Sequence, residues 1–355
     1  MPIPPLYGHE GTRNRLVGAI ASGRLPQALL FEGPQGVGKQ RLALWLAQAL
    51  VCEGRGETGT EEPCGKCQPC KLVLSLSHPD VHWFVPLELA KRGADADRQV
   101  ELTEEALAEE MAARRQRPLY ESPTGLAIHG IAAVRLLLRQ LALKPALGRR
   151  KVFVIGDAER LVPQAGTDAA ANALLKALEE PPADSVFILT AAAPESLLPT
   201  ILSRVVRVRM APLGDSIVAA FAQHELGLTG QRDVAQRVAI ADGCPGRLLA
   251  DGGRGAESGD AAAQFLAAVA EGPVRHYAAA LAQQPFQARG GFTGMLDGLL
   301  EQLRQHARSG RETDKVVAAI SRVLEARGLA QGNVNPQLVA AVLAGDLAGE
   351  EGEPE

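Results

Sequence analysis

Residues 26–50 combine two patterns of hydrophobic positions. Apolar residues run without interruption from Ala28 to Phe31, as in a strand buried on both faces. A glycine-rich loop follows. Beyond it, apolar positions recur at helical spacing on the face formed by Leu42, Trp45, Leu46, Ala49 and Leu50. The pattern predicts a strand, a tight loop and an amphipathic helix in succession.

Three further apolar runs, at 152–155, 186–190 and 205–208, predict buried strands of a parallel sheet. Between them, helical spacing predicts helices over about 130–143 and about 168–180. The second helix has to end before Pro181, because proline cannot continue a hydrogen-bonded helix. Strands that alternate with helices in this way indicate an α/β fold with a parallel sheet.

The rest of the chain divides where the pattern changes. Residues 86–125 are charged and rich in helix breakers, so we expect an insertion there with one exposed helix near 103–116. After Pro212 the strand pattern stops, and helical segments separated by glycine-rich turns predict an all-α remainder. The expected divisions are an α/β domain at 1–211, a helical lid at 212–252, a C-terminal helical domain at 253–347 and an acidic tail at 348–355.

Composition limits the function. The chain has 355 residues, enough for two or three hydrophobic cores, and its 46% apolar and 22% charged residues are a globular balance. The formal net charge of −4 gives no overall basic footprint, so contact with nucleic acid would be local or made through partners. We find no run of about 18 apolar residues and no leader pattern at the N-terminus, and therefore expect a soluble cytoplasmic protein.

The glycine loop, Gly-Pro-Gln-Gly-Val-Gly-Lys, has the spacing of a phosphate-binding loop. Backbone N–H groups could approach phosphate oxygens at its three glycines, which are Gly33, Gly36 and Gly38. Lys39 would reach the terminal phosphates. The next residue departs from the pattern, because Gln40 stands where a Ser or Thr hydroxyl holds Mg²⁺.

The second metal ligand of such a site departs as well. In the usual pattern an Asp at the end of a neighbouring strand binds the ion, and the following Glu activates water. Here Gly156 and Asp157 occupy these positions. Two losses at one ion predict that the chain cannot hold Mg²⁺ across the β and γ phosphates, so hydrolysis is not expected even if nucleotide binds. One alternative stays open, in which a one-residue bulge lets Asp157 serve as the metal carboxylate.

Four of the five cysteines are close in sequence, which favours a metal site over disulfides. They are Cys52, Cys64, Cys67 and Cys70. Four thiolates would saturate a tetrahedral zinc ion, so the expected site is structural. An iron–sulfur cluster and a set of unligated buried cysteines are the alternatives. The fifth cysteine, Cys244, is expected to be a small apolar filler.

The run NALLKALEEPP at residues 172–182, followed by Thr190 and then by Leu202-Ser203-Arg204, resembles the AAA+ subunits of clamp loaders. The cysteine module after the loop helix is similar to that of the bacterial subunits of DNA polymerase III, gamma/tau and delta-prime. The resemblance covers about residues 5–250, and the remainder agrees only in being helical. It implies a RecA-like AAA+ sheet domain with an inserted zinc module at 52–70, a small helical lid and a C-terminal helical collar domain.

The resemblance also implies roles for single residues. Arg204 lies in Ser-Arg-Val where the family has Ser-Arg-Cys, and would be an arginine finger that reaches the γ phosphate held by a neighbouring gamma/tau subunit. Thr190 would take the sensor-1 position and Arg247 the sensor-2 position of the lid. Motor subunits of the family keep the loop hydroxyl and the Asp-Glu pair, so Gln40 and Gly156 favour the delta-prime type.

The implied function is that of a non-hydrolysing stator in a hetero-pentameric ring with delta and gamma/tau, which loads the sliding clamp on primed DNA as part of the DNA polymerase III holoenzyme. The degenerate nucleotide site would consist of Gly33, Gly36, Gly38, Lys39, Gln40, Asp157, Thr190 and Arg247. Two alternatives remain. One is an ATP-hydrolysing gamma/tau-like motor, and the other is a stand-alone P-loop enzyme such as a kinase.

Overall fold

The computed structural model describes residues 3–54, 62–87, 95–117, 119, 127–161, 169–250, 254–283, 291–308, 313–331 and 334–351. The chain forms two compact units, Met1–Leu249 and Ala250–Glu355. Each unit has a hydrophobic core of its own.

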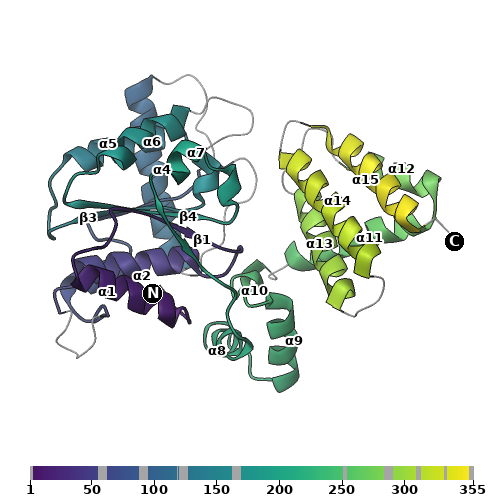
Figure 1. Ribbon diagram of the computed structural model, residues 1–355, viewed down its shortest axis with the longest axis horizontal. Helices are drawn as coiled ribbons and strands as arrows, with labels where there is room; N and C mark the ends of the chain where they lie inside the picture. Colours follow the sequence, from purple (N-terminus) through teal and green to yellow (C-terminus); the bar gives the residue numbers. More distant parts are fainter. Residues whose placement is uncertain are drawn as a thin grey trace. The chain divides into compact units, whose positions relative to one another are not determined.

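The first unit is built on a five-stranded sheet in which every pairing is parallel (Figure 1). In spatial order the strands are β2 (Val81–Phe84), β3 (Lys151–Ile155), β4 (Ser185–Ala191), β1 (Ala28–Glu32) and β5 (Val206–Arg209). Every residue of β3 and β4 is buried. The register places Phe31 of β1 beside Thr190 of β4, so these two central strands end at the same edge of the sheet.

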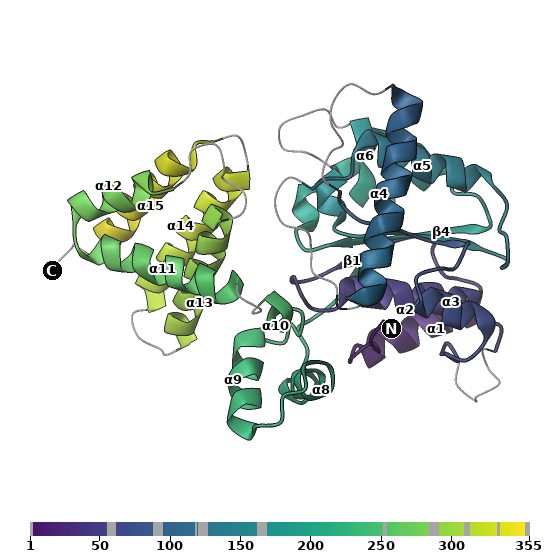
Figure 2. The same ribbon diagram turned by 180° about the vertical axis from the view of Figure 1, so that it is seen from behind.

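Helices cover both faces of this sheet (Figures 1 and 2). One face carries α1 (Glu10–Ala21) and α2 (Lys39–Val51), and the other carries α5 (Ile131–Ala142), α6 (Ala169–Glu179) and α7 (Pro199–Leu202). Coverage of both faces explains why the inner strands β1, β3 and β4 read as continuous apolar runs. Strand β5 lies at the edge and is mostly exposed, so the expectation of a buried strand at 205–208 was wrong. The predicted α/β class with a parallel sheet is confirmed.

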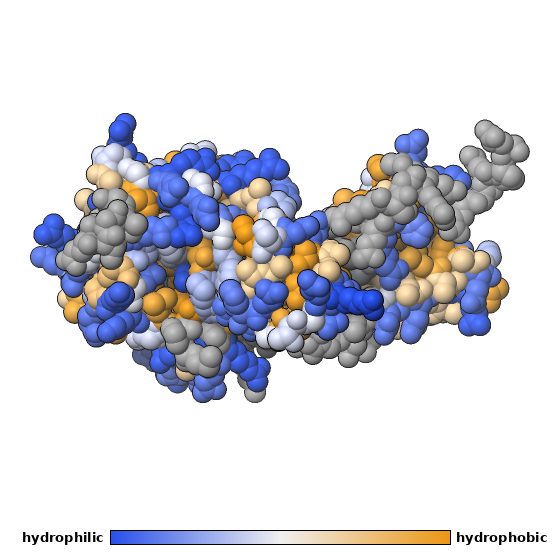
Figure 3. Space-filling model, turned by 90° about the horizontal axis from the view of Figure 1, so that it is seen from below, coloured by the Kyte–Doolittle hydropathy of each residue, from blue (hydrophilic) through white to orange (hydrophobic). Residues whose placement is uncertain are grey.

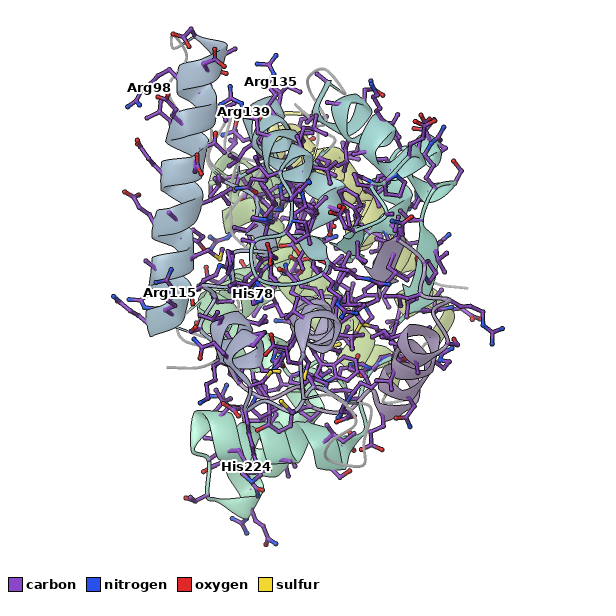
Figure 4. All side chains as sticks on the ribbon, turned by 90° about the vertical axis from the view of Figure 1, so that its left-hand side faces the viewer. His78, Arg98, Arg115, Arg135, Arg139 and His224 are labelled. Atoms are coloured by element: carbon purple, nitrogen blue, oxygen red, sulfur yellow. The ribbon has the colours of Figure 1, made fainter. Side chains whose placement is uncertain are left out.

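The structure adds one strand and lengthens one helix. Strand β2 pairs with β3 at the edge of the sheet, but its four residues, VHWF, are too few and too mixed to form an apolar run. Helix α4 (Ala96–Gln116) begins before the expected range, and it is not simply exposed, because Val100 and Leu107 are buried. The guanidinium of Arg114 lies 4.7 Å from the ring centroid of Trp83 in β2. Figure 4 shows α4 beside the sheet, with Arg98 near one end and Arg115 near the other.

The first unit also contains shorter elements and three helices that follow β5. The shorter elements are α3 (Gln68–Leu74) and the 3₁₀ helices η1 (Ala158–Leu161) and η2 (Pro194–Ser196). The three helices are α8 (Asp215–Leu226), α9 (Gln231–Ala241) and α10 (Arg247–Ala250). They share a small core of their own, to which Val218, Phe221 and Leu248 belong.

The second unit is helical throughout its described part. Its helices are α11 (Arg254–Ala270), α12 (Pro273–Leu281), α13 (Thr293–Arg308), α14 (Thr313–Gln331) and α15 (Pro336–Glu351). Leu296, Leu299 and Val323 are completely buried in its core. Among the helices that the structure describes, none is long and apolar enough to cross a membrane. On the face that Figure 3 shows, hydrophilic residues (blue) and hydrophobic residues (orange) are intermixed.

Candidate nucleotide site and cysteine cluster

The loop between β1 and α2 has a backbone that favours glycine. Gly36 and Gly38 have φ angles of 82° and 104°, in a region that residues with a side chain rarely adopt. Helix α2 begins directly after the loop, at Lys39. The loop therefore leads into a helix N-terminus, which is the arrangement that binds phosphate in P-loop proteins.

The side chain of Lys39 bends back onto this loop. Its Nζ donates hydrogen bonds to the carbonyl oxygens of Gly33 and Pro34, each over 2.9 Å. Burial lowers the pKa of the lysine, while the negative charges of Glu159 and Asp157 act in the opposite direction. The loop itself thus provides the hydrogen-bond acceptors of its lysine.

Gln40 lies in a buried chain of hydrogen bonds that crosses the site. Its Oε1 accepts from the indole Nε1 of Trp83 over 2.8 Å, and its Nε2 donates to Oδ1 of Asp157 over 3.1 Å. Gln40 is 6% exposed and Asp157 is 7% exposed. A Cβ atom built on Gly156 would lie 2.4 Å from Oε1 of Gln40. The amide of Gln40 therefore occupies the space that a side chain at position 156 would need.

Residues at the carboxyl ends of β3 and β4 also lie at the site. Asp157 follows β3 in a left-handed conformation with a φ of 49°, and its backbone N–H donates to Oγ1 of Thr190 over 3.1 Å. Glu159 accepts a hydrogen bond from the backbone N–H of Ala192 over 3.0 Å. Burial and the nearby Asp157 raise the pKa of Glu159. The structure thus brings Asp157 and Thr190 together beside the loop.

A fully buried histidine holds the backbone of position 156. Nε2 of His129 lies 2.7 Å from the carbonyl oxygen of Gly156, to which the neutral ring donates a hydrogen bond. Burial lowers the pKa of His129 to about 4. Neither His129 nor Trp83 was predicted, because neither belongs to a phosphate-loop motif.

The turn that precedes α10 packs directly on the glycine loop. The backbone N–H of Gly246 donates to the carbonyl oxygen of Gly36 over 2.9 Å. A Cβ atom on Gly246 would lie 2.7 Å from Cα of Gly36, so the two main chains are in contact. Arg247 follows in this turn, and its guanidinium lies 3.4 Å from the carboxylate of Asp242. The structure therefore brings the backbone of Arg247 to the loop and its side chain to Asp242.

Arg204 lies at the amino ends of the parallel strands, whereas the glycine loop lies at their carboxyl ends. The glycine loop follows β1, whereas Arg204 precedes β5, which is parallel to β1 and has Val206 beside Leu29. The backbone rises about 3.3 Å per residue, so β1 alone separates the two edges by about 13 Å. Arg204 is therefore not grouped with the residues around the glycine loop.

The four clustered cysteines form a group suited to a single metal ion. Their sulfur atoms all lie within 4.8 Å of one another, including 4.0 Å between Cys64 and Cys70 and 3.9 Å between Cys67 and Cys52. Bonds of about 2.3 Å to a tetrahedral ion would place the sulfurs about 3.8 Å apart, which fits this spacing. Hydrogen bonds from the backbone N–H groups of Cys67 and Lys66 lower the pKa of Cys64 to about 6, whereas burial raises the pKa of Cys52 and of Cys70. The cluster can hold a metal ion.

The fold and this loop define the class of protein. A parallel sheet of order β2-β3-β4-β1-β5, a glycine loop between β1 and α2 and a helical segment packed on that loop are the elements of an AAA+ P-loop module. The family model described as "DNA polymerase III, delta subunit" matches residues 8–214, and the chain belongs to this family. The predicted resemblance to bacterial clamp-loader subunits is confirmed.

Individual relatives agree with this assignment. The chain is 29% identical over 236 residues to DNA polymerase III subunit delta' of Escherichia coli strain K12, an alignment that covers 66% of this chain and 57% of that protein. It is 33% identical over 198 residues to subunit delta' of Bacillus subtilis strain 168, covering 56% of this chain and 46% of the relative.

Subunit gamma/tau of Mycobacterium tuberculosis strain H37Rv is 32% identical over 199 residues, which cover 56% of this chain and 27% of that protein. The alignments span about half the length of the delta' relatives. A crystal structure of a DNA polymerase III gamma subunit-related protein of Thermotoga maritima aligns over 96% of this chain and 99% of that chain, with 16% identity and a TM-score of 0.38.

Proposed function

We propose that this chain is a delta-prime-type stator of a bacterial clamp loader. It assembles with delta and gamma/tau subunits into a ring that places the sliding clamp on primed DNA, and it does not hydrolyse ATP itself. The observation that carries the proposal is the amide of Gln40, which fills the space beside Gly156. Membership of the DNA polymerase III delta family supports the choice of complex.

The hydrogen bonds of Gln40 support the proposed loss of metal binding. A magnesium ion at this position needs an oxygen ligand from the loop helix and a carboxylate from the neighbouring strand. Both polar ends of the Gln40 amide are engaged in the protein, by Trp83 and by Asp157. A metal would have to break these buried hydrogen bonds, and broken buried bonds cost about 1–3 kcal/mol each when no new partner replaces them.

The alternative in which Asp157 binds the metal receives no support from this geometry. Oδ1 of Asp157 already accepts the hydrogen bond of Gln40. An ion placed between Gln40 and Asp157 would break this hydrogen bond, because it would separate Nε2 of Gln40 from Oδ1 of Asp157. An active gamma/tau-like motor is therefore the weaker proposal, and so is a stand-alone P-loop enzyme.

A role in trans for Arg204 is supported by its place in the sheet. The residue lies at the amino end of β5, away from the glycine loop of its own chain. A guanidinium at this edge could reach only a nucleotide that another subunit holds. Such a residue would neutralise the charge that develops on the γ phosphate as ATP is cleaved.

We propose zinc as the ion of the cysteine cluster. Four sulfurs within 4.8 Å of one another suit one tetrahedral ion, whereas a cluster of several irons holds its thiolates farther apart. Four cysteine ligands leave no open coordination position, so the ion would stabilise the fold and take no part in chemistry. Elemental analysis would distinguish zinc from iron with inorganic sulfide.

Two activity measurements test the proposal. The purified chain alone should show no Mg²⁺-dependent ATP hydrolysis, and turnover that Lys39→Ala abolishes would reject the stator. In a loader reconstituted with delta and gamma/tau, Arg204→Ala should slow ATP hydrolysis on clamp and primed DNA by 10-fold or more, because arginine fingers contribute about 10³–10⁵ where they are essential. Arg209→Ala, which removes an exposed arginine at the far end of β5 from Arg204, is the control.

A further inference from the structure

The guanidinium of Arg204 is engaged within its own chain. Nη1 donates to the carbonyl oxygen of Thr200 over 2.8 Å and lies 3.2 Å from Oγ of Ser203. Nη2 forms an ion pair with the carboxylate of Glu179, the last residue of α6. Nε is buried and has no partner among the residues that the structure describes. Both terminal nitrogens thus already have acceptors.

This arrangement differs from the one that an arginine finger needs. A guanidinium binds phosphate most strongly when two of its N–H groups point at two oxygens together. In Arg204 the terminal nitrogens that could do so face Thr200, Ser203 and Glu179. The side chain has to release Glu179 before it can present Nη2 to a phosphate.

We infer that Glu179 is a positioning residue that holds Arg204 in a parked orientation until the nucleotide of a neighbouring subunit competes for it. The inference rests on the proposed finger role of Arg204. The side chains of Arg204 and Glu179 are 31% and 46% exposed, so water can reach the pair. Ion pairs at such sites are weak, which makes the contact easy to exchange.

The direction of the effect follows from charge. The Glu179 carboxylate competes with the phosphate for the guanidinium of Arg204. It also repels the phosphate, because the carboxylate and the phosphate are both negative. A γ phosphate carries more charge and more acceptor oxygens than one carboxylate, so it wins the exchange when the subunits come together. Removal of the Glu179 charge should therefore strengthen ATP binding at the shared site without harm to the chemical step.

The chain offers a matched control next to this residue. Glu180 is exposed, and it has no ion-pair partner among the described residues. Glu180→Gln changes the net charge by the same amount and at almost the same place. A difference between the two variants would therefore report the contact with Arg204 and not the overall charge of the surface.

The experiment measures ATP hydrolysis by the complete reconstituted loader over a range of ATP concentrations, with clamp and primed DNA present. Glu179→Gln should lower KM for ATP by about two- to five-fold, the range set by the strength of exposed ion pairs, with kcat unchanged. Glu179→Asp should restore the KM, and Glu180→Gln should leave it unchanged. Higher salt should reduce the difference, because it screens the pair in the unaltered protein.

Other results would overturn the inference. An unchanged KM in Glu179→Gln would show that the carboxylate does not compete for the finger, and a lower kcat would show that it aligns the finger for catalysis. A failure of the proposed function looks different, because the loader would then not assemble or Arg204→Ala would leave kcat unchanged. Thermal melting of each variant before assembly separates these outcomes from misfolding.

Discussion

The side-chain amide of Gln40 occupies the volume that a side chain at position 156 would need, and position 156 is a glycine. The 2.4 Å separation between Oε1 of Gln40 and a Cβ atom at position 156 is shorter than any ordinary contact. The amide cannot simply move aside, because Trp83 and Asp157 hold both of its ends. The two departures from the magnesium-binding pattern are therefore one linked change.

Gly156→Ala should lower the free energy of unfolding by about 1–3 kcal/mol, as overpacked cores do. The added methyl group has to displace the buried amide of Gln40 and break one or both of its hydrogen bonds. Urea denaturation measures the change. Gly148→Ala is the matched control, because a Cβ there would meet its nearest neighbours at 3.6 Å, an ordinary contact.

The double variant Gln40→Thr with Gly156→Asp tests the linkage. The shorter threonine vacates the volume that the new carboxylate enters, so the double variant should be more stable than the sum of the two single changes predicts. A surplus of about 1 kcal/mol or more is expected, since residues in contact show coupling of that size. Additive single effects would contradict the shared volume.

Lys39→Ala should leave ATP hydrolysis by the reconstituted loader unchanged within two-fold. The lysine is held by carbonyl oxygens of its own loop, next to a site that we propose to lack magnesium. The same substitution in the loop of gamma/tau is the positive control and should abolish turnover. A clear loss of activity from Lys39→Ala in this subunit would mean that its loop binds a nucleotide that the cycle requires.

Removal of the metal should unfold the cysteine module locally. Cys67→Ser should abolish metal binding and lower the melting temperature of the chain, because a structural ion contributes its binding free energy to folding. Metal content and melting temperature are measured on the same sample. Cys244→Ala removes the buried cysteine that lies outside the cluster, and it should retain one ion per chain.

Stability should decrease as the pH falls from about 6.5 towards 4. Burial lowers the pKa of His129 and of His82 to about 4 in the folded chain. Unfolded histidines take up protons near pH 6.5, so between these values the unfolded state binds more protons and gains stability. The melting temperature should drop by several degrees across this window. In His129→Gln the drop should be smaller, and an equal drop would exclude this histidine as a cause.

The sequence predicted the elements that have a local pattern. Continuous apolar runs predicted β1, β3 and β4, and glycine spacing predicted the loop before α2. The run at 205–208 predicted the position of β5, but the expected burial was wrong, because Val206, Arg207 and Arg209 are exposed at the edge of the sheet. The sequence pattern missed β2, whose four residues VHWF include a histidine and lie at the sheet edge, and it took α4 for an exposed helix although Leu107 is buried. Local periodicity cannot show which face of a charged helix meets a neighbour.

The site was predicted as a set of motif positions, without the contacts between them. The replacements at Gln40 and Gly156 were recognised as two losses, but the shared volume depends on how β3 packs against α2. Trp83 donates to Gln40 across 43 positions of the chain, and Glu179 pairs with Arg204 across 25. Such partners follow from the tertiary fold, so no spacing rule could name them.

The main chains of Gly36 and Gly246 are in contact, so the phosphate loop and the turn before α10 depend on each other for their positions. A methyl group added at either glycine would wedge the three helices after β5 away from the sheet. The close packing of these parts thus depends on the absence of two side chains. In the proposed stator, two glycines would therefore decide how closely the three helices can approach the sheet.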